Sequence, residues 1–226
     1  MRRVILTALV LLTGCSESAE TTTTAPPPTL TTLGEAVVES TPPTSTTTPP
    51  ETTTTSTSTT TTLPPNASAE YGLTQVVFGA SAFVVITNWG NGPGNLLGHW
   101  LCQSTSYMAL PNVELGPGDQ VLVGLAKTPP PDLAGMAATI FLGPAIGDLA
   151  PDSGEVALFE AAAFNSPEDI VAYVQWGEQD QERSAIAVSA GIWDGGTVEV
   201  FDEAPSISSG VFPAASSSDW FADVGG

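Results

Sequence analysis

The chain has 226 residues and a formal net charge of −20, with 24 acidic residues against four lysines and arginines. Nucleic-acid binding needs cationic groups that displace counterions from phosphates, and anionic lipid headgroups repel an acidic surface. The charge therefore argues against a nucleic-acid partner and against adsorption to anionic membranes. It suits solubility and the attraction of cations or basic partners.

The first 15 residues have the order of an export signal. Arg2 and Arg3 precede an apolar run over residues 4–12, and the sequence Leu-Thr-Gly-Cys then ends at Cys15. The apolar run is too short to span a bilayer as a helix, which takes about 20 residues. It has the length of the hydrophobic region of a secretory signal.

The ending Leu-Thr-Gly-Cys resembles the lipobox of bacterial lipoproteins. The resemblance implies that residues 1–14 are a signal peptide, that the thiol of Cys15 receives a diacylglyceryl group, and that cleavage makes Cys15 the new N-terminus. The mature protein would then be lipid-anchored on the extracellular face of the cell membrane. The alternative is an ordinary signal peptide with a chance cysteine.

Residues 15–69 are predicted to form a disordered stalk. Residues 21–65 alone hold 21 Thr and 9 Pro and no aromatic residue. Such a composition buries too little apolar surface to offset the entropy of ordering the chain. Proline favours extended conformations of about 3.1 Å per residue, so the stalk reaches on the order of 100 Å, far enough to carry a domain into a cell-wall layer.

Residues 70–226 are predicted to form one all-β domain. Short runs of β-branched and aromatic residues alternate with turns rich in Gly, Pro and Asn, which is typical of a sandwich or barrel. The alanine-rich stretch 182–190 is the exception, because it predicts a short helix that Gly191 would end. The expected strands are residues 74–78, 82–87, 96–102, 120–125, 139–142, 155–160, 170–176 and 197–201.

Large aromatic side chains dominate the cores of domains of this size. We therefore expect four of the five tryptophans in the core, namely Trp89, Trp100, Trp176 and Trp193. Trp220 lies in a polar segment near the C-terminus and would either dock on the body or stay exposed.

Several short motifs follow one another over residues 73–177. A strand ending in Asn88 is followed by Leu-Leu-Gly-His-Trp at 96–100, by Leu-Gly-Pro-Gly-Asp at 115–119, and by two strands that end near Phe159 and Trp176. This order resembles the bacterial lamin-tail type of immunoglobulin-like domain, although His99 is an extra residue and Phe159-Glu160 departs from the usual aromatic-Asp pair. The resemblance implies an immunoglobulin-like β-sandwich with an interaction or scaffold role and no catalysis.

Few residues are available for nucleophilic catalysis or zinc binding. The chain has one histidine, His99, and one cysteine besides Cys15, namely Cys102. Residues three apart in a strand point to opposite faces, so we expect no Cys–His dyad, with Cys102 a small buried residue and His99 an ordinary strand residue. Zinc needs several His or Cys ligands. We therefore expect no zinc site and no catalytic residue.

Carboxylates are plentiful and leave two further possibilities open. Paired acids could hydrolyse glycosides, although a solvated acidic surface explains them more simply. Calcium prefers oxygen ligands, and the loop 147–155 offers Asp148, Asp152 and Glu155, without the spacing of an EF-hand and with a plain polar turn as the alternative. We expect no cofactor other than this possible Ca²⁺. The candidate acids for hydrolysis are Glu168, Asp169, Glu178, Asp180, Glu182, Asp202 and Glu203.

The sequence favours a non-enzymatic binding or structural module that is presented to cell-wall polymer or to another envelope protein. One alternative is an accessory substrate-capture or scaffold subunit of an exported hydrolase system. The other is a divergent hydrolase that uses carboxylates, for which a site with two converging acids would be required.

Overall fold

The computed structural model describes residues 64–226, except for residues 148, 178–179, 202–203 and 224–226. The predicted signal peptide, the predicted lipidation site Cys15 and most of the predicted stalk lie outside the described residues. Among the described residues, no helix is long and apolar enough to cross a membrane.

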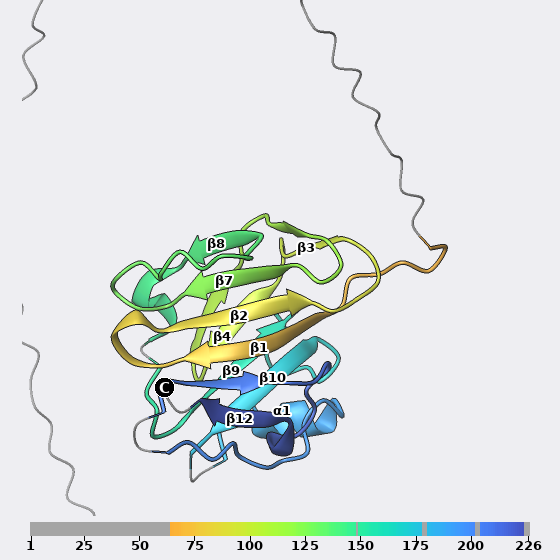
Figure 1. Cartoon of the computed structure of the whole chain (residues 1–226). Helices are drawn as coiled ribbons and strands as arrows, with labels where there is room; N and C mark the ends of the chain where they lie inside the picture. The colour runs from red at the N-terminus through yellow and green to blue at the C-terminus, as the bar shows by residue number, and fades with distance from the viewer. Residues whose placement is uncertain (1–63, 148, 178–179, 202–203, 224–226) are drawn as a thin grey trace, which may run out of the picture. The chain divides into compact units, whose positions relative to one another are not determined.

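The described residues form an all-β domain with one short α-helix, as the sequence predicts (Figure 1). Its strands are β1 (Tyr71–Val77), β2 (Phe83–Asn88), β3 (Gly94–Asn95), β4 (Trp100–Gln103), β5 (Ser106–Ala109), β6 (Glu114–Leu115), β7 (Gln120–Gly124), β8 (Ala138–Phe141), β9 (Gly154–Phe159), β10 (Ile170–Trp176), β11 (Ser206–Ser209) and β12 (Trp220–Asp223). The helix is α1 (Ser184–Ser189), and short 3-10 helices cover Gly79–Ser81, Gly143–Ile146 and Ser217–Asp219.

The strands form two main sheets. One has six strands in the order β12-β11-β1-β2-β7-β8, and the other has four in the order β10-β9-β4-β5, while β3 and β6 form a two-stranded ribbon. Neighbouring strands are antiparallel except for β7 and β8, which run parallel.

The core follows from the alternation of side chains along each strand. Val84 and Ile86 of β2 belong to one apolar cluster with residues of the four-stranded sheet such as Leu158. The intervening residues Phe83 and Val85 belong to a second cluster, which the 126–137 segment covers with two apolar side chains, Leu133 and Met136. The centre of the six-stranded sheet is therefore buried on both faces, which explains why β2 is a continuous apolar run.

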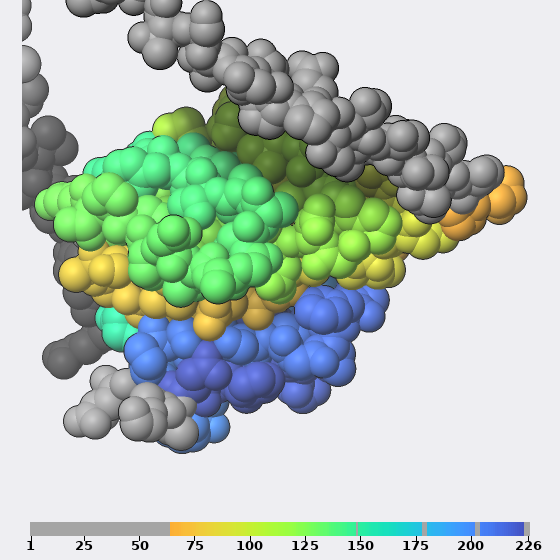
Figure 2. Space-filling model, turned by 45° about the horizontal axis from the view of Figure 1, so that its top comes forward, coloured from red at the N-terminus to blue at the C-terminus, as the bar shows by residue number. Residues whose placement is uncertain are grey.

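The first and last described strands lie in the same sheet. Gln75 of β1 is opposite Ser208 of β11, and Ser208 is opposite Phe221 of β12. Figure 2 shows the C-terminal residues, in blue, packed against the orange residues of β1. Trp220 is only 6% exposed, so the C-terminal segment docks on the body of the domain.

Asn88, at the end of β2, connects several turns. Its side chain is fully buried. Its Nδ2 donates to three backbone carbonyls and its Oδ1 accepts from two backbone N–H groups, so one side chain satisfies five buried or partly buried polar groups of the backbone. The carbonyls are those of Gly92 (2.9 Å), Leu115 (3.0 Å) and Gly116 (3.1 Å), and the N–H groups are those of Glu70 and Gly90 (3.1 Å each).

The predicted strand 96–102 is wrong in part, and the predicted strand 197–201 is wrong as a whole. Gly98 has a φ of +93°, and the N–H of His99 donates to the carbonyl of Leu96, so residues 96–99 form a turn and the strand starts at Trp100. His99 is therefore a turn residue and not the strand residue that we predicted. Residues 197–201 contribute only an isolated bridge from Val198 to Trp176.

Most other expectations agree with the structure. The helix α1 lies within the predicted stretch 182–190, and the chain turns after it at Gly191, whose φ is +72°. Trp176 and Trp193 are buried in the core, as predicted. Trp100 is half-buried and packs against the core. The prediction for Trp89 is wrong, because Trp89 is half-buried and belongs to neither core cluster.

Candidate functional site

A cluster of interacting polar side chains lies on the outer face of the four-stranded sheet. Glu155 of β9 and Gln175 of β10 are cross-strand neighbours, and Tyr173 lies two residues from Gln175 on the same face. A strand face of this kind usually meets solvent. Here residues 181–196, which include α1 and which we call the α1 cover, lie over it and bury all three side chains.

Glu155 is the most deeply buried acid among the described residues, at 1% exposed. Its Oε2 accepts hydrogen bonds from the hydroxyl of Tyr173 and from the backbone N–H of Arg183, both at 2.9 Å. Its Oε1 has no hydrogen bond of normal geometry, although the N–H of Ser104 faces the carboxyl group. Burial raises the pKa of Glu155 above its usual range, and the hydrogen bonds offset only part of that shift.

Gln175 holds both ends of the α1 cover. Its Oε1 accepts from the backbone N–H of Gln181, and its Nε2 donates to the carbonyl of Gly196, each at 2.9 Å. The carbonyl of Gly196 also accepts the indole N–H of Trp193 at 2.7 Å. The Trp193 ring meets the ring of Tyr173 edge-on at 5.4 Å, so the cover is fixed by polar and aromatic contacts together.

The hydroxyl of Tyr173 lies 2.9 Å from both Glu155 Oε2 and Gln175 Oε1. A phenol has one proton to donate, so these two acceptors compete for it. Burial and the neighbouring carboxyl of Glu155 raise the pKa of Tyr173, which keeps the hydroxyl protonated. Tyr173 is therefore a donor in this network and not a base.

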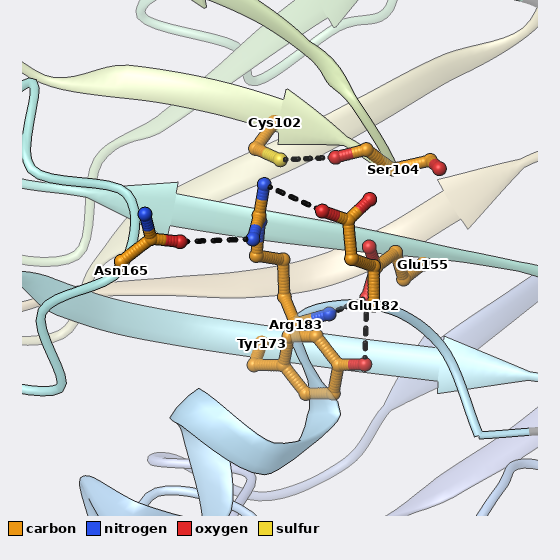
Figure 3. A network of polar contacts seen from close by, with 7 residues as sticks. All are labelled: Cys102, Ser104, Glu155, Asn165, Tyr173, Glu182 and Arg183. Atoms are coloured by element: carbon orange, nitrogen blue, oxygen red, sulfur yellow. Dashed lines mark hydrogen bonds and ion pairs between the residues drawn. The ribbon is translucent and has the colours of Figure 1, made fainter.

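Arg183 is one of two strong bases among the described residues and is only 7% exposed. Its side chain runs from the start of α1 toward Cys102 and Asn165 (Figure 3). The guanidinium donates to the Asn165 side chain at 3.3 Å and pairs with Glu182 at 3.1 Å. It also lies 5.3 Å from the centre of the Tyr107 ring. The guanidinium charge therefore interacts with Asn165, Glu182 and the Tyr107 ring. Only the backbone N–H of Arg183 bonds to Glu155.

Cys102 is fully buried, as predicted, and its thiol lies 3.2 Å from the carbonyl of Ser104. Burial raises its pKa to about 12, although the hydrogen bond from Arg183 acts in the opposite direction. The thiol therefore stays protonated at neutral pH, whereas the thiolate is the reactive form. His99 lies in the turn before β4 and contacts Tyr71 edge-on at 5.0 Å, and burial lowers its pKa.

The residues predicted as calcium ligands do not converge. Asp152 is exposed at the turn before β9, whereas Glu155 is buried and bonded to Tyr173 and Arg183. Asp148 lies outside the described residues. Within the part of the chain that the structure describes, no three His, Cys, Asp or Glu residues come together as metal ligands would.

The predicted carboxylate candidates are distributed around the domain. Glu168, Asp180 and Glu182 are exposed, and Asp169 is half-buried. Glu178, Asp202 and Glu203 lie outside the described residues. The acid that the structure singles out is Glu155, which the sequence suggested only as a metal ligand, and its partners Tyr173 and Gln175 were not predicted as site residues. The sequence signal was present, because polar residues at alternate positions mark one face of β10.

An open groove of about 490 Å³ lies next to this network. It is lined by Tyr107 of β5 and by residues 162–166 of the loop between β9 and β10. The rings of Tyr107 and Phe164 stack at 3.7 Å, and Asn165 connects the groove to Arg183. This is a surface hollow in which part of an extended molecule could rest.

Known proteins give no further guidance on this site. Compared with models of protein families and with curated sequences, the chain matches no family model and no curated protein.

Proposed function

We propose that the chain is a bacterial lipoprotein whose signal peptide, residues 1–14, is removed before Cys15. A lipid on Cys15 anchors the protein to the extracellular face of the cell membrane, and the stalk over residues 15–69 carries the β-rich domain outward. The observation that carries the proposal is the sequence Leu-Thr-Gly-Cys at the end of a short apolar run behind Arg2 and Arg3. Two or three acyl chains hold a protein stably, because each buried methylene contributes about 0.8 kcal/mol.

The anchor is tested by fractionating bacteria that express the full chain. We expect the wild-type protein in the membrane fraction and its release by detergent, with incorporation of labelled fatty acid. Cys15→Ser should abolish both the label and the membrane retention. Cys102→Ser is the matched control, because it removes the other cysteine of the chain and should change neither. Membrane retention and labelling of the Cys15→Ser chain would refute the lipoprotein assignment.

The domain at the end of the stalk is, in this proposal, a non-catalytic binding module of the immunoglobulin-like, lamin-tail type. It is supported by the position of the two groups best suited to acid–base or nucleophilic chemistry. Glu155 and Cys102 are both buried within the fold and bonded to neighbouring residues. Acids such as Asp152 and Glu168 are exposed instead, and an acidic surface with exposed loops suits contact with cell-wall polymer or with another envelope protein.

Binding is tested by co-sedimentation of the unlipidated chain with cell envelopes from its own organism, with and without EDTA. We expect saturable retention, and sensitivity to EDTA would show that a divalent cation contributes. Ala163→Arg places a bulky side chain at an exposed groove position, and Ala134→Arg makes the same change at an exposed position on the 126–137 segment. Loss of retention in the first variant alone places the ligand in the groove. No retention of the wild-type chain would refute a wall-binding role.

A further inference from the structure

The α1 cover (residues 181–196) is held on the four-stranded sheet by two buried polar side chains together with the apolar contacts of Ala187 and Trp193. Glu155 accepts the N–H of Arg183, and Gln175 bonds to the N–H of Gln181 and the carbonyl of Gly196. Within α1 itself only Ser184 and Ala187 are buried. The stability of the closed cover therefore depends in part on whether the carboxyl of Glu155 is stable in a site that water does not reach.

Among the described residues, no cation acts on that carboxyl from the elements packed against it. β10 supplies the hydroxyl of Tyr173, and β4 with the turn after it supplies the thiol of Cys102 and the N–H of Ser104. The start of the cover supplies the N–H of Arg183 and, nearby, a second carboxylate, which is that of Glu182. The guanidinium of Arg183 bonds instead to Glu182 and Asn165.

An ionised Glu155 is therefore poorly accommodated when the cover is closed. Its Oε1 would carry charge without a hydrogen bond of normal geometry, and a buried charge without a partner costs several kcal/mol or shifts its protonation instead. A proton on Oε1 removes the charge and leaves Oε2 free to accept from Tyr173 and Arg183. Opening of the cover would let water solvate the ionised form.

We propose that the α1 cover opens and closes with the protonation of Glu155, so that it is closed over the protonated carboxyl and opens more often when the carboxyl is ionised. Opening exposes the polar outer face of the four-stranded sheet and the thiol of Cys102. The fold thus contains a pH-sensitive element on the face next to the Tyr107–Phe164 groove.

The sign of the pH dependence follows from linkage. Burial raises the pKa of Glu155 in the closed form, whereas in the open, hydrated form the pKa returns to an ordinary value of about 4.3. When the pH lies between the ordinary and the raised pKa of Glu155, the ratio of open to closed molecules increases with pH, by at most about tenfold for each pH unit. Above the raised pKa this ratio no longer changes. The cover is therefore most firmly closed in acid.

Hydrogen exchange tests this proposal on the chain with Cys15→Ser, which has no thiol at position 15 to receive a lipid. Protection factors, which correct for the intrinsic effect of pH, are measured from pH 4.5 to 8.5. In the wild type we expect the α1 cover to lose at least about tenfold of its protection relative to β2 and β7 as the pH rises. Glu155→Gln should make the protection of the cover independent of pH. Glu168→Gln removes one exposed acid and should behave as the wild type.

Trypsin gives an independent measurement that does not depend on the variants. The described residues contain two cleavage sites, the exposed Lys127 and the buried Arg183 at the start of the cover. The rate of cleavage at Arg183 divided by that at Lys127 cancels the pH profile of the protease, and it should rise with pH in the wild type. The proposal would be overturned if, in the wild type, both the ratio of cleavage rates and the protection of the cover were independent of pH. It would also be overturned if the protection of the cover in Glu155→Gln depended on pH as it does in the wild type.

Discussion

Replacing Asn88 by alanine tests whether one buried amide organises the turns at one end of the domain. The substitution removes three hydrogen bonds to carbonyls and two from N–H groups. The resulting gap is small, so the main effect should come from the backbone groups that lose a partner.

The expected loss follows from the number of groups that lose their partner. A buried polar group left without a partner costs about 1–3 kcal/mol. Three of the five groups keep a second partner: the carbonyl of Gly116 also accepts from Asp119, the N–H of Gly90 also reaches the carbonyl of Glu70, and the carbonyl of Leu115 is paired with Gly94 in the β3–β6 ribbon. With the N–H of Glu70 and the carbonyl of Gly92 left unpaired, we expect a loss of about 2–4 kcal/mol, a large part of the stability of a typical domain.

Urea unfolding followed by tryptophan fluorescence measures this loss. With a slope of about 2 kcal/mol per molar urea, the midpoint should fall by roughly 1–2 M. Asn91→Ala removes one exposed hydrogen bond, to the N–H of Ser68, and should shift the midpoint by less than about 0.5 M. Asn88→Asp keeps the accepting oxygen, but it replaces the donating Nδ2 by a second oxygen that faces three carbonyl oxygens. It should therefore lower the midpoint at least as much as alanine does. A shift for Asn88→Ala no larger than that for Asn91→Ala would refute the reasoning.

Further predictions concern a glycine, the buried thiol and the buried acid. Gly154→Ala should lower the thermal midpoint much more than Gly98→Ala, because a Cβ at 154 would lie 2.5 Å from the Trp176 ring, whereas at 98 it meets only the strain of a positive φ. The thiol of Cys102, with its pKa raised to about 12, should react with a disulfide reagent at pH 8 at least about a hundredfold more slowly in the native chain than in urea. Equal rates would show that it is accessible. The raised pKa of Glu155 means that the folded state binds its proton more tightly than the unfolded state does. The stability from this group should therefore be greatest below its ordinary pKa and fall as the pH rises to the raised pKa. Glu155→Gln should remove that fall, which urea midpoints at pH 4.5, 6 and 7.5 can measure.

The strands with clear alternation and strong turn signals could be predicted from the sequence. β10 covers the predicted residues 170–176, and β9 differs from its prediction by one residue at each end. β11 and β12 were missed because their residues include three serines and only one β-branched side chain. The pairing of β11 with β1, and of β12 with β11, brings them into the sheet. Residues 197–201 alternate well, yet only Val198 finds a strand partner.

The polar network could not be derived from the sequence, because it depends on which segment lies over the sheet. Alternation correctly places Glu155 and Gln175 on one face of the four-stranded sheet, but it also predicts that this face meets water. The α1 cover reverses that expectation for both residues. Arg183 is of a residue type that is almost never fully buried unless it is paired, and it is only 7% exposed in the structure. Tertiary context, and not local preference, decided the environment of each of these side chains.

The pairing of β1 with β11 and of β11 with β12 determines when the domain can be completed during synthesis. Gln75 must meet Ser208, and Ser208 must meet Phe221, before the six-stranded sheet has its full set of strands. The contact of Gln75 with Ser208 joins positions more than a hundred residues apart, which makes folding slow compared with local structure formation. A chain that emerges from its N-terminus therefore lacks a complete six-stranded sheet until residues 220–223 have appeared. If the chain is exported as proposed, this delay would keep it unfolded during most of its passage across the membrane.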